Sequence, residues 1–231
     1  VYHRFVLPTV SDDRRDRRKS YSDTWQEFGR VVVAFFDKKN IGIAIVFMLI
    51  YRLSEAMLVK LASPFMLDAR SEGGLGLSTE AVGVVYGTVG IIALIVGGIL
   101  GGIAISRWGL RRCLMPMALA LTLPNLVYVY MALWQPTSLV LINGAVAAEQ
   151  FGYGFGFTAY MMYLIRFSEG EYKTSHYAIC SGFMALGMML PGMAAGWIQT
   201  TLGSYLIFFI FVVICILPTI VIVLLVRSKM D

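Results

Sequence analysis

The sequence predicts an all-α polytopic membrane protein, because it is strongly apolar, sparsely charged and divided into six long hydrophobic stretches. Of its 231 residues, 58% are hydrophobic and 14% are charged, and the mean hydropathy is +0.74. Soluble domains carry about 25% charged residues, so the chain falls outside that class. Each stretch reaches the roughly 20 residues that a helix needs to cross a bilayer core about 30 Å thick.

The six predicted spans are joined by segments that carry charges and helix breakers. The spans are residues 41–63, 79–105, 113–134, 138–164, 176–199 and 205–226. The connectors are residues 68–74, 106–112, 135–137, 166–175 and 200–204. Hydrocarbon offers no partner for an exposed backbone N–H or C=O, so we expect every span to be helical.

Residues 1–40 are predicted to be a cytoplasmic linker with an amphipathic helix, followed by the six-helix bundle over residues 41–231. Residues 1–19 are polar, include a cationic run at 14–19 and are expected to form a flexible loop. Thr24-Trp25-Gln26-Glu27 then fits a capping box. The apolar face of this helix comprises Trp25, Phe28, Val32, Phe35 and Phe36. Such a helix lies on the inner membrane surface or packs against its own loops.

The first residue is valine, so we expect the chain to be the second half of a larger protein.

Lysine and arginine are distributed unevenly between the two sides of the membrane. If the first span starts in the cytoplasm, the inside carries Lys38, Lys39, Arg107, Arg111, Arg112, Arg166, Lys173, Arg227 and Lys229. The outside loops carry Arg70 alone. This bias predicts that both ends are cytoplasmic. The cationic run lacks interleaved aromatic residues, so an anionic membrane leaflet suits it better than nucleic acid.

Cysteine and histidine usage gives no support for an enzyme, a metal site or a cofactor. Cys113, Cys180 and Cys215 are scattered over three spans without CxxC spacing, and His3 and His176 are the only histidines. His176 stands at a span boundary, where an interfacial role is expected. A polytopic membrane enzyme remains an alternative, although it would need a nucleophile or a metal cluster.

Ionisable residues inside the first and fourth spans are the main functional signal. Arg52 and Glu55 lie within residues 41–63 at i and i+3, a spacing that allows them to pair. A charge at the centre of an inserting helix costs roughly 2.5–3.5 kcal/mol, so such groups face a cavity or a partner. The fourth span contributes Glu149, Gln150, Tyr153 and Tyr160. These side chains are candidates for solute binding and proton coupling, with plain helix packing as the alternative for the tyrosines.

An offset of 94 residues relates the two halves of the bundle. Gly98-x3-Gly102-x6-Gly109 recurs as Gly192-x3-Gly196-x6-Gly203, and the same shift pairs Glu55 with Glu149 and Pro124 with Pro218. Three spans per unit require the two copies to be inverted. The sequence therefore predicts two inverted three-helix repeats. The glycine pairs, including Gly83-x3-Gly87, are also expected to let helices approach closely.

The loop between the second and third spans resembles the signature loop of major facilitator transporters, G-x-x-x-[DE]-R-x-G-x-R-R. The matching residues are Gly102, Arg107, Gly109, Arg111 and Arg112. Ser106 stands where the acidic residue belongs, which weakens a charge-relay role for this loop. The resemblance implies one half of a major facilitator fold, with the second and fifth spans meeting an N-terminal half.

Finer motifs resemble the AmpG-type muropeptide permeases. They are Tyr51–Ala56 in the first span, Glu171–Ala178 before the fifth, Met184–Gly187 and Ala195–Trp197 within it, and Tyr2–Pro8 at the start. The resemblance implies proton-driven import of cell-wall-derived muropeptides across a bacterial inner membrane, with small solutes and protons as partners. Another solute, such as a sugar, a nucleotide or an acyl-CoA, remains open.

For the mechanism, we hypothesise that Glu55 or Glu149 carries the proton. Burial favours the neutral carboxyl group, whereas a nearby Arg52 favours the charged one, so a movement that separates them would switch protonation. A static Arg52–Glu55 ion pair that holds the first span in register is the alternative.

Overall fold

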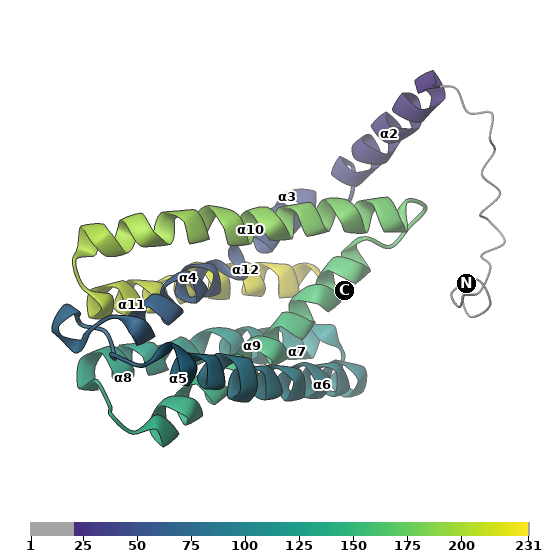
Figure 1. Ribbon diagram of the computed structural model, residues 1–231. Coiled ribbons are helices and arrows are strands. Elements are labelled where there is room, and N and C mark those ends of the chain that lie inside the picture. Colours follow the sequence, from purple (N-terminus) through teal and green to yellow (C-terminus); the bar gives the residue numbers. More distant parts are fainter. Residues whose placement is uncertain (1–20, 231) are drawn as a thin grey trace, which may run out of the picture. The chain divides into compact units, whose positions relative to one another are not determined.

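The computed structural model describes residues 21–230, which fold into helices with no strand among them (Figure 1). The predicted all-α polytopic membrane fold is confirmed. The chain divides into a unit that ends at Lys38 and a unit from Lys39 to Asp231, and each is described by itself. The predicted loop at residues 1–19, with its cationic run, lies outside the described residues, as does the Tyr2–Pro8 motif.

The first unit contains helix α2 (Tyr21–Phe36). It begins three residues before Thr24, so the predicted capping box is wrong. Thr24 falls inside the first turn, whereas a capping residue has a non-helical backbone. Helix α2 is amphipathic, and the rings of Trp25 and Phe28 on its apolar face contact each other edge to face and are exposed.

The second unit holds the six predicted spans. The first is α3 (Ile41–Ile50) and α4 (Leu53–Leu67); the second is α5 (Thr79–Val84), η2 (Val85–Gly90) and α6 (Ile91–Trp108). The third is α7 (Leu110–Thr122), η3 (Leu123–Asn125) and α8 (Leu126–Trp134). The fourth is α9 (Leu139–Phe167), the fifth α10 (Lys173–Leu202), and the sixth α11 (Tyr205–Ile214) with α12 (Ile216–Lys229). The short η1 (Arg70–Glu72) lies in the first connector.

Within the described residues, five of these spans are long and apolar enough to cross a membrane. The exception is α9, a single helix of 29 residues. Asn143, Glu149 and Gln150 make it less apolar, and it packs against both α6 and α7 inside the bundle. Glu149 is buried in this packing and Gln150 is half-buried.

The spans are helical as expected, but four of them are not uniform α-helices. The first breaks at Tyr51 and Arg52, and the second contains the π-helical turn η2. The third turns 3₁₀ at Leu123–Asn125, and the sixth breaks at Cys215. Pro124 lies in the third-span break and Pro218 in the first turn of α12, where a missing N–H is tolerated. The two prolines paired by the 94-residue offset thus mark breaks in equivalent spans.

Helix packing in the second unit follows the predicted repeat. The second span packs against the fourth, since α6 contacts α9, and the fifth packs against the first, since α10 contacts α3 and α4. The third span likewise contacts the fourth through α7 and α9, as the sixth contacts the first through α12 and α3. Exchanging the first three spans for the last three maps each contact onto another. This exchange agrees with two three-helix repeats.

The predicted glycine contacts are partly present. Gly192 faces α4, where an added Cβ atom would lie 3.4 Å from the Ala56 carbonyl oxygen, but tighter approaches use other glycines. On Gly152 of α9 a Cβ atom would lie 2.0 Å from the Ala120 carbonyl oxygen of α7. A Cβ atom on Gly97 would lie 2.2 Å from the Phe151 carbonyl oxygen, and one on Gly154 would lie 2.1 Å from that of Leu94. By contrast, Gly83, Gly87, Gly102 and Gly196 face open space. The face of α6 that contacts α9 therefore includes Gly97, one residue before the predicted Gly98. Neighbouring residues of an α-helix point about 100° apart, so a shift of one residue selects a different face.

Candidate transport site

Arg52 stands at the break between α3 and α4 and is 8% exposed. Its guanidinium donates a hydrogen bond to the Tyr153 hydroxyl and lies over two rings of α9, 5.1 Å from the centre of Tyr153 and 4.7 Å from that of Phe157. Contacts of this kind stabilise a desolvated cation by about 2 kcal/mol. The aromatic face of α9 therefore holds the charge that the first span introduces.

Glu55 lies one turn along, in the first turn of α4, and is 1% exposed. Neither of its carboxylate oxygens has a hydrogen-bond partner in the described chain, and the same is true of the Ser54 hydroxyl. The predicted pairing of Arg52 with Glu55 is therefore wrong. The physical reason is the helix break, because Arg52 precedes α4 and its guanidinium reaches across to α9 instead.

Glu149 lies near the middle of α9 and is 2% exposed. The Gln150 side-chain amide donates to its two oxygens at 3.2 and 3.0 Å, and the Tyr128 hydroxyl donates at 3.5 Å. Tyr128 is also hydrogen-bonded to Tyr86. A chain of hydroxyl groups thus runs from the second and third spans to the carboxyl group of the fourth.

The two carboxyl groups lie close enough to interact electrostatically. Glu55 also acts electrostatically on Tyr86, Tyr128 and Tyr153. The structure therefore brings five of the six predicted site residues together. We call the whole set the carboxylate cluster: Arg52, Glu55, Tyr86, Tyr128, Glu149, Gln150 and Tyr153.

Tyr160, the sixth predicted residue, is fully buried and packs between helices. Its hydroxyl donates to the Met48 carbonyl oxygen of α3 at 2.6 Å, and its ring stacks on that of Tyr51 with centres 5.1 Å apart. Tyr51 in turn donates to the Gly156 carbonyl oxygen at 2.9 Å. This reciprocal pair ties α3 to α9 directly beside Arg52. The contacts are those of a packing residue, and they support the packing alternative for Tyr160.

Tyr86 and Tyr128 are members of the cluster that the sequence reasoning missed. Both lie among apolar and small residues, so nothing in the local sequence distinguishes them from other tyrosines. A hydroxyl group within an apolar stretch is the one signal that could have drawn attention to them.

The signature-loop residues form a tight junction at one end of the bundle. Gly109 alone separates α6 from α7, and its φ of 79° with ψ of 152° is accessible essentially to glycine. The side chains of Arg107, Arg111 and Arg112 are exposed, and Arg227 of α12 donates to the Arg111 carbonyl oxygen at 3.1 Å. Ser106 donates to the carbonyl oxygen of Ile103 within its own helix. Gly102 faces open space on α6.

No group of three or more His, Cys, Asp or Glu side chains that could hold a metal ion occurs within residues 21–230. The three cysteines are free thiols in buried positions. His176, predicted to be interfacial, is 3% exposed and packs near the ring of Tyr172.

Comparison with known proteins adds relatives that match most of the chain. The anhydromuropeptide permease of Escherichia coli K12 is 26% identical over 197 residues, which cover 85% of this chain and 39% of the relative. Two candidate rickettsial transporters also match. AmpG 4 of Rickettsia conorii is 27% identical over 85% of this chain and 46% of the relative. AmpG 2 of Rickettsia prowazekii is 29% identical over 86% and 47%.

The chain is homologous to the AmpG-type permeases. The resemblance drawn from its motifs is thereby confirmed, and a major facilitator assignment is consistent with it. No protein-family model matches the chain. The chain spans less than half the length of these relatives, between 39% and 47%.

Proposed function

We propose that the chain forms the C-terminal six-helix half of a proton-coupled transporter that imports cell-wall-derived muropeptides across a bacterial inner membrane. The observation that carries this proposal is the carboxylate cluster, buried inside a membrane bundle whose relatives are named permeases and transporters. Residues 1–40 serve as the cytoplasmic linker from an N-terminal half, and the open glycine faces of the second and fifth spans offer the surface that meets that half.

The cluster suits proton coupling because Glu55 has no hydrogen-bond partner in the described chain. A bare carboxylate in a dry interior is disfavoured by several kcal/mol, so a group in this position takes up a proton readily. Glu149 shares the same surroundings but has the Gln150 amide and the Tyr128 hydroxyl as partners. The two acids thus differ in how well each supports a charge, as a carrier and its acceptor must.

The cluster also suits a glycan-containing solute. Aromatic rings bind sugar faces, and amide, guanidinium and hydroxyl groups bind sugar hydroxyls. Tyr153, Phe157, Gln150 and Arg52 supply these groups side by side on the first and fourth spans.

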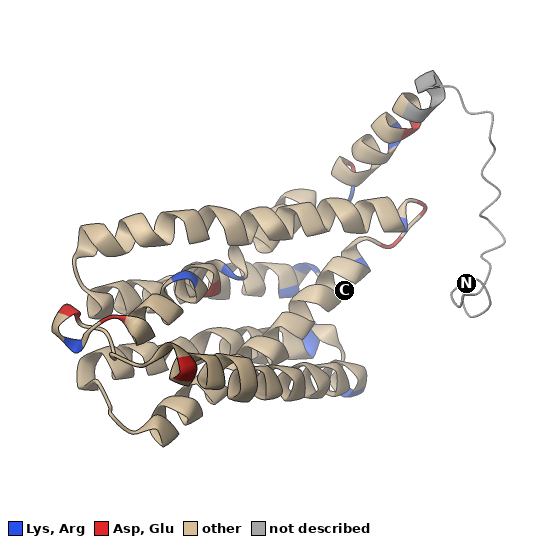
Figure 2. Ribbon diagram, in the orientation of Figure 1, with Lys and Arg blue, Asp and Glu red and all other residues tan. Residues whose placement is uncertain are grey.

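The orientation with both ends cytoplasmic is part of the proposal. The basic loop residues gather at the end where α3 begins and α6, α9 and α12 end (Figure 2). Arg70 lies at the other end, in η1. An excess of Lys and Arg in short loops is typical of the cytoplasmic side.

Uptake by the complete natural chain in proteoliposomes tests the substrate. A labelled N-acetylglucosaminyl-anhydromuramyl peptide should accumulate unchanged, and unlabelled muropeptide should compete more strongly than glucose, a nucleotide or an acyl-CoA. If one of these competitors accumulates and muropeptide does not, the transported substrate is that competitor. Chemical conversion of the solute would point to a membrane enzyme.

A further inference from the structure

A basic pocket of about 220 Å³ opens at one end of the bundle, away from the carboxylate cluster. It lies where α3 begins and where α9 and α12 end. Its cationic lining residues are Lys39, Arg166 and Lys229, and no acidic side chain of the described residues lines it. The positive charge in the pocket is therefore not neutralised by its own walls.

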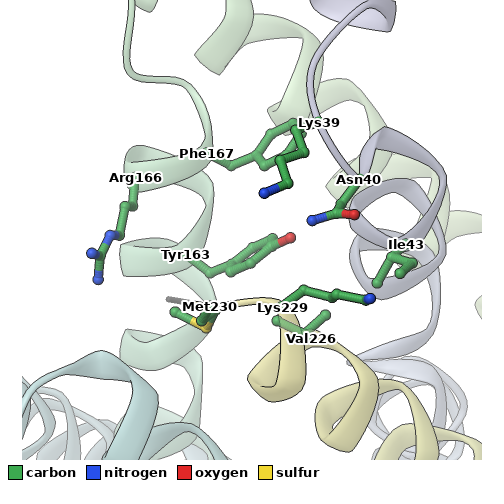
Figure 3. A pocket seen from close by; sticks show the side chains of 9 residues that line it. All are labelled: Lys39, Asn40, Ile43, Tyr163, Arg166, Phe167, Val226, Lys229 and Met230. Carbon is green, nitrogen blue, oxygen red and sulfur yellow. The ribbon is translucent and has the colours of Figure 1, made fainter.

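Hydrogen-bonding groups converge on the same space. Figure 3 shows the Lys39 amine, the Asn40 amide and the Tyr163 hydroxyl turned toward the middle of the pocket. Asn40 is held there by a left-handed backbone with φ of 62° and ψ of 25°, which places its side chain beside the start of α3. Asparagine is among the few residues that adopt this conformation readily.

The remaining walls are apolar. Ile43, Phe167, Val226 and Met230 also line the pocket. Because α3, α9 and α12 cross or line the membrane bundle, their ends lie at the depth of lipid headgroups. A ligand with a phosphate and an attached apolar chain would contact both the polar groups and the apolar side chains of the pocket. Free phosphate would contact the polar groups alone.

We propose that this pocket binds the phosphate of an anionic phospholipid headgroup. The phosphate accepts hydrogen bonds from Lys39, Asn40 and Tyr163, and Arg166 and Lys229 add positive charge around it. Basic pockets between membrane helices suit such headgroups. The site joins the ends of three spans, including the first and fourth that carry the cluster, so a bound lipid would brace their cytoplasmic ends.

Native mass spectrometry of the complete protein, delipidated in detergent, tests this assignment. Phosphatidylglycerol should remain bound after phosphatidylcholine is lost. The Lys39→Gln/Lys229→Gln double variant should bind phosphatidylglycerol about thirtyfold more weakly, at roughly 1 kcal/mol for each removed cation. Lys173→Gln is the matched control, because Lys173 begins α10 at the same end of the bundle but lies outside this pocket. It should bind as the wild type does.

A second variant guards against misfolding. Asn40→Asp preserves shape and backbone preference but places a negative charge beside the phosphate, so it should also lose phosphatidylglycerol, whereas Asn40→Gly should retain most of the binding. Equal retention of both lipids, or wild-type binding by the double variant and Asn40→Asp, would overturn the site. Binding of inorganic phosphate without preference for phosphatidylglycerol would overturn the lipid as its ligand.

Discussion

Arg52 is a buried cation whose partners are a phenol and two aromatic rings. This arrangement leaves Glu55 free of a fixed counter-ion contact, although Arg52 still acts on it electrostatically. A static ion pair, the alternative considered from the sequence, is therefore not what the first span contains. In the proposed mechanism, solute binding or a conformational change controls the protonation of Glu55.

Tyr160 and Tyr153 provide a test that separates packing from transport. Tyr160→Phe removes a buried hydrogen bond to the Met48 carbonyl oxygen and should destabilise the protein by about 1 kcal/mol with an unchanged KM for uptake. Tyr153→Phe removes a partner of Arg52 and should change KM or pH dependence. Thermal unfolding and uptake kinetics of both variants provide the measurement. A change in KM for Tyr160→Phe would show that Tyr160 contributes to solute binding and is not only a packing residue.

The approach of α6 to α9 depends on glycine backbone contacts. Gly154→Ala places a Cβ atom 2.1 Å from the Leu94 carbonyl oxygen and should destabilise the bundle by about 3 kcal/mol, the upper end of overpacking effects. Gly144→Ala is the control in the same helix, since nothing lies within 4 Å of its added Cβ. It should be neutral or slightly stabilising, because alanine favours a helix. Equal thermal stability of the two variants would show that α6 and α9 are not in this contact.

The junctions that end α6 and α10 provide a second comparison between helices. Gly109 and Gly203 are repeat partners, but Gly109 has ψ of 152° and Gly203 has a left-handed backbone with φ of 68° and ψ of 7°. Gly109→Asn should destabilise the protein by about 1–3 kcal/mol, whereas asparagine should be tolerated at Gly203. Urea or thermal unfolding of both variants checks this difference. The reverse order of stability would contradict the geometry at Gly109.

The helices and the site were predictable to different degrees. The spans could be predicted because hydropathy is a property of the sequence itself. The equivalence of Glu55 and Glu149 could be predicted because the 94-residue offset is visible in the sequence. The partner of Arg52 could not, because i, i+3 spacing assumes an unbroken helix and the chain breaks at Tyr51 and Arg52. The contact glycines were predicted in part: Gly192 contacts α4, whereas α6 uses Gly97 in place of Gly98 and the contacts of Gly152 and Gly154 in α9 were not predicted. Spacing defines a helical face, but it does not say which face meets a neighbouring helix.

Charge distribution over the whole bundle predicts its orientation. Glu72 lies in η1 beside Arg70, and Glu171 lies in the connector between α9 and α10, just before Lys173; both side chains are exposed. In intact spheroplasts, Glu72→Cys should react with a membrane-impermeant maleimide, and Glu171→Cys should react only after lysis. The native cysteines are buried, so they give a low background. Labelling of Glu171→Cys before lysis would place both ends of the chain outside.

Within the described residues, the buried acidic side chains are Glu55 of the first span and Glu149 of the fourth, which interact electrostatically. This pair is the proposed coupling site. Its most direct test is muropeptide uptake by the complete protein in proteoliposomes, with and without a pH gradient, in the wild type, Glu55→Gln and Glu149→Gln. Each neutral variant should lose accumulation driven by the gradient while still exchanging internal for external solute. Gradient-driven accumulation at the wild-type level in both variants would contradict the account.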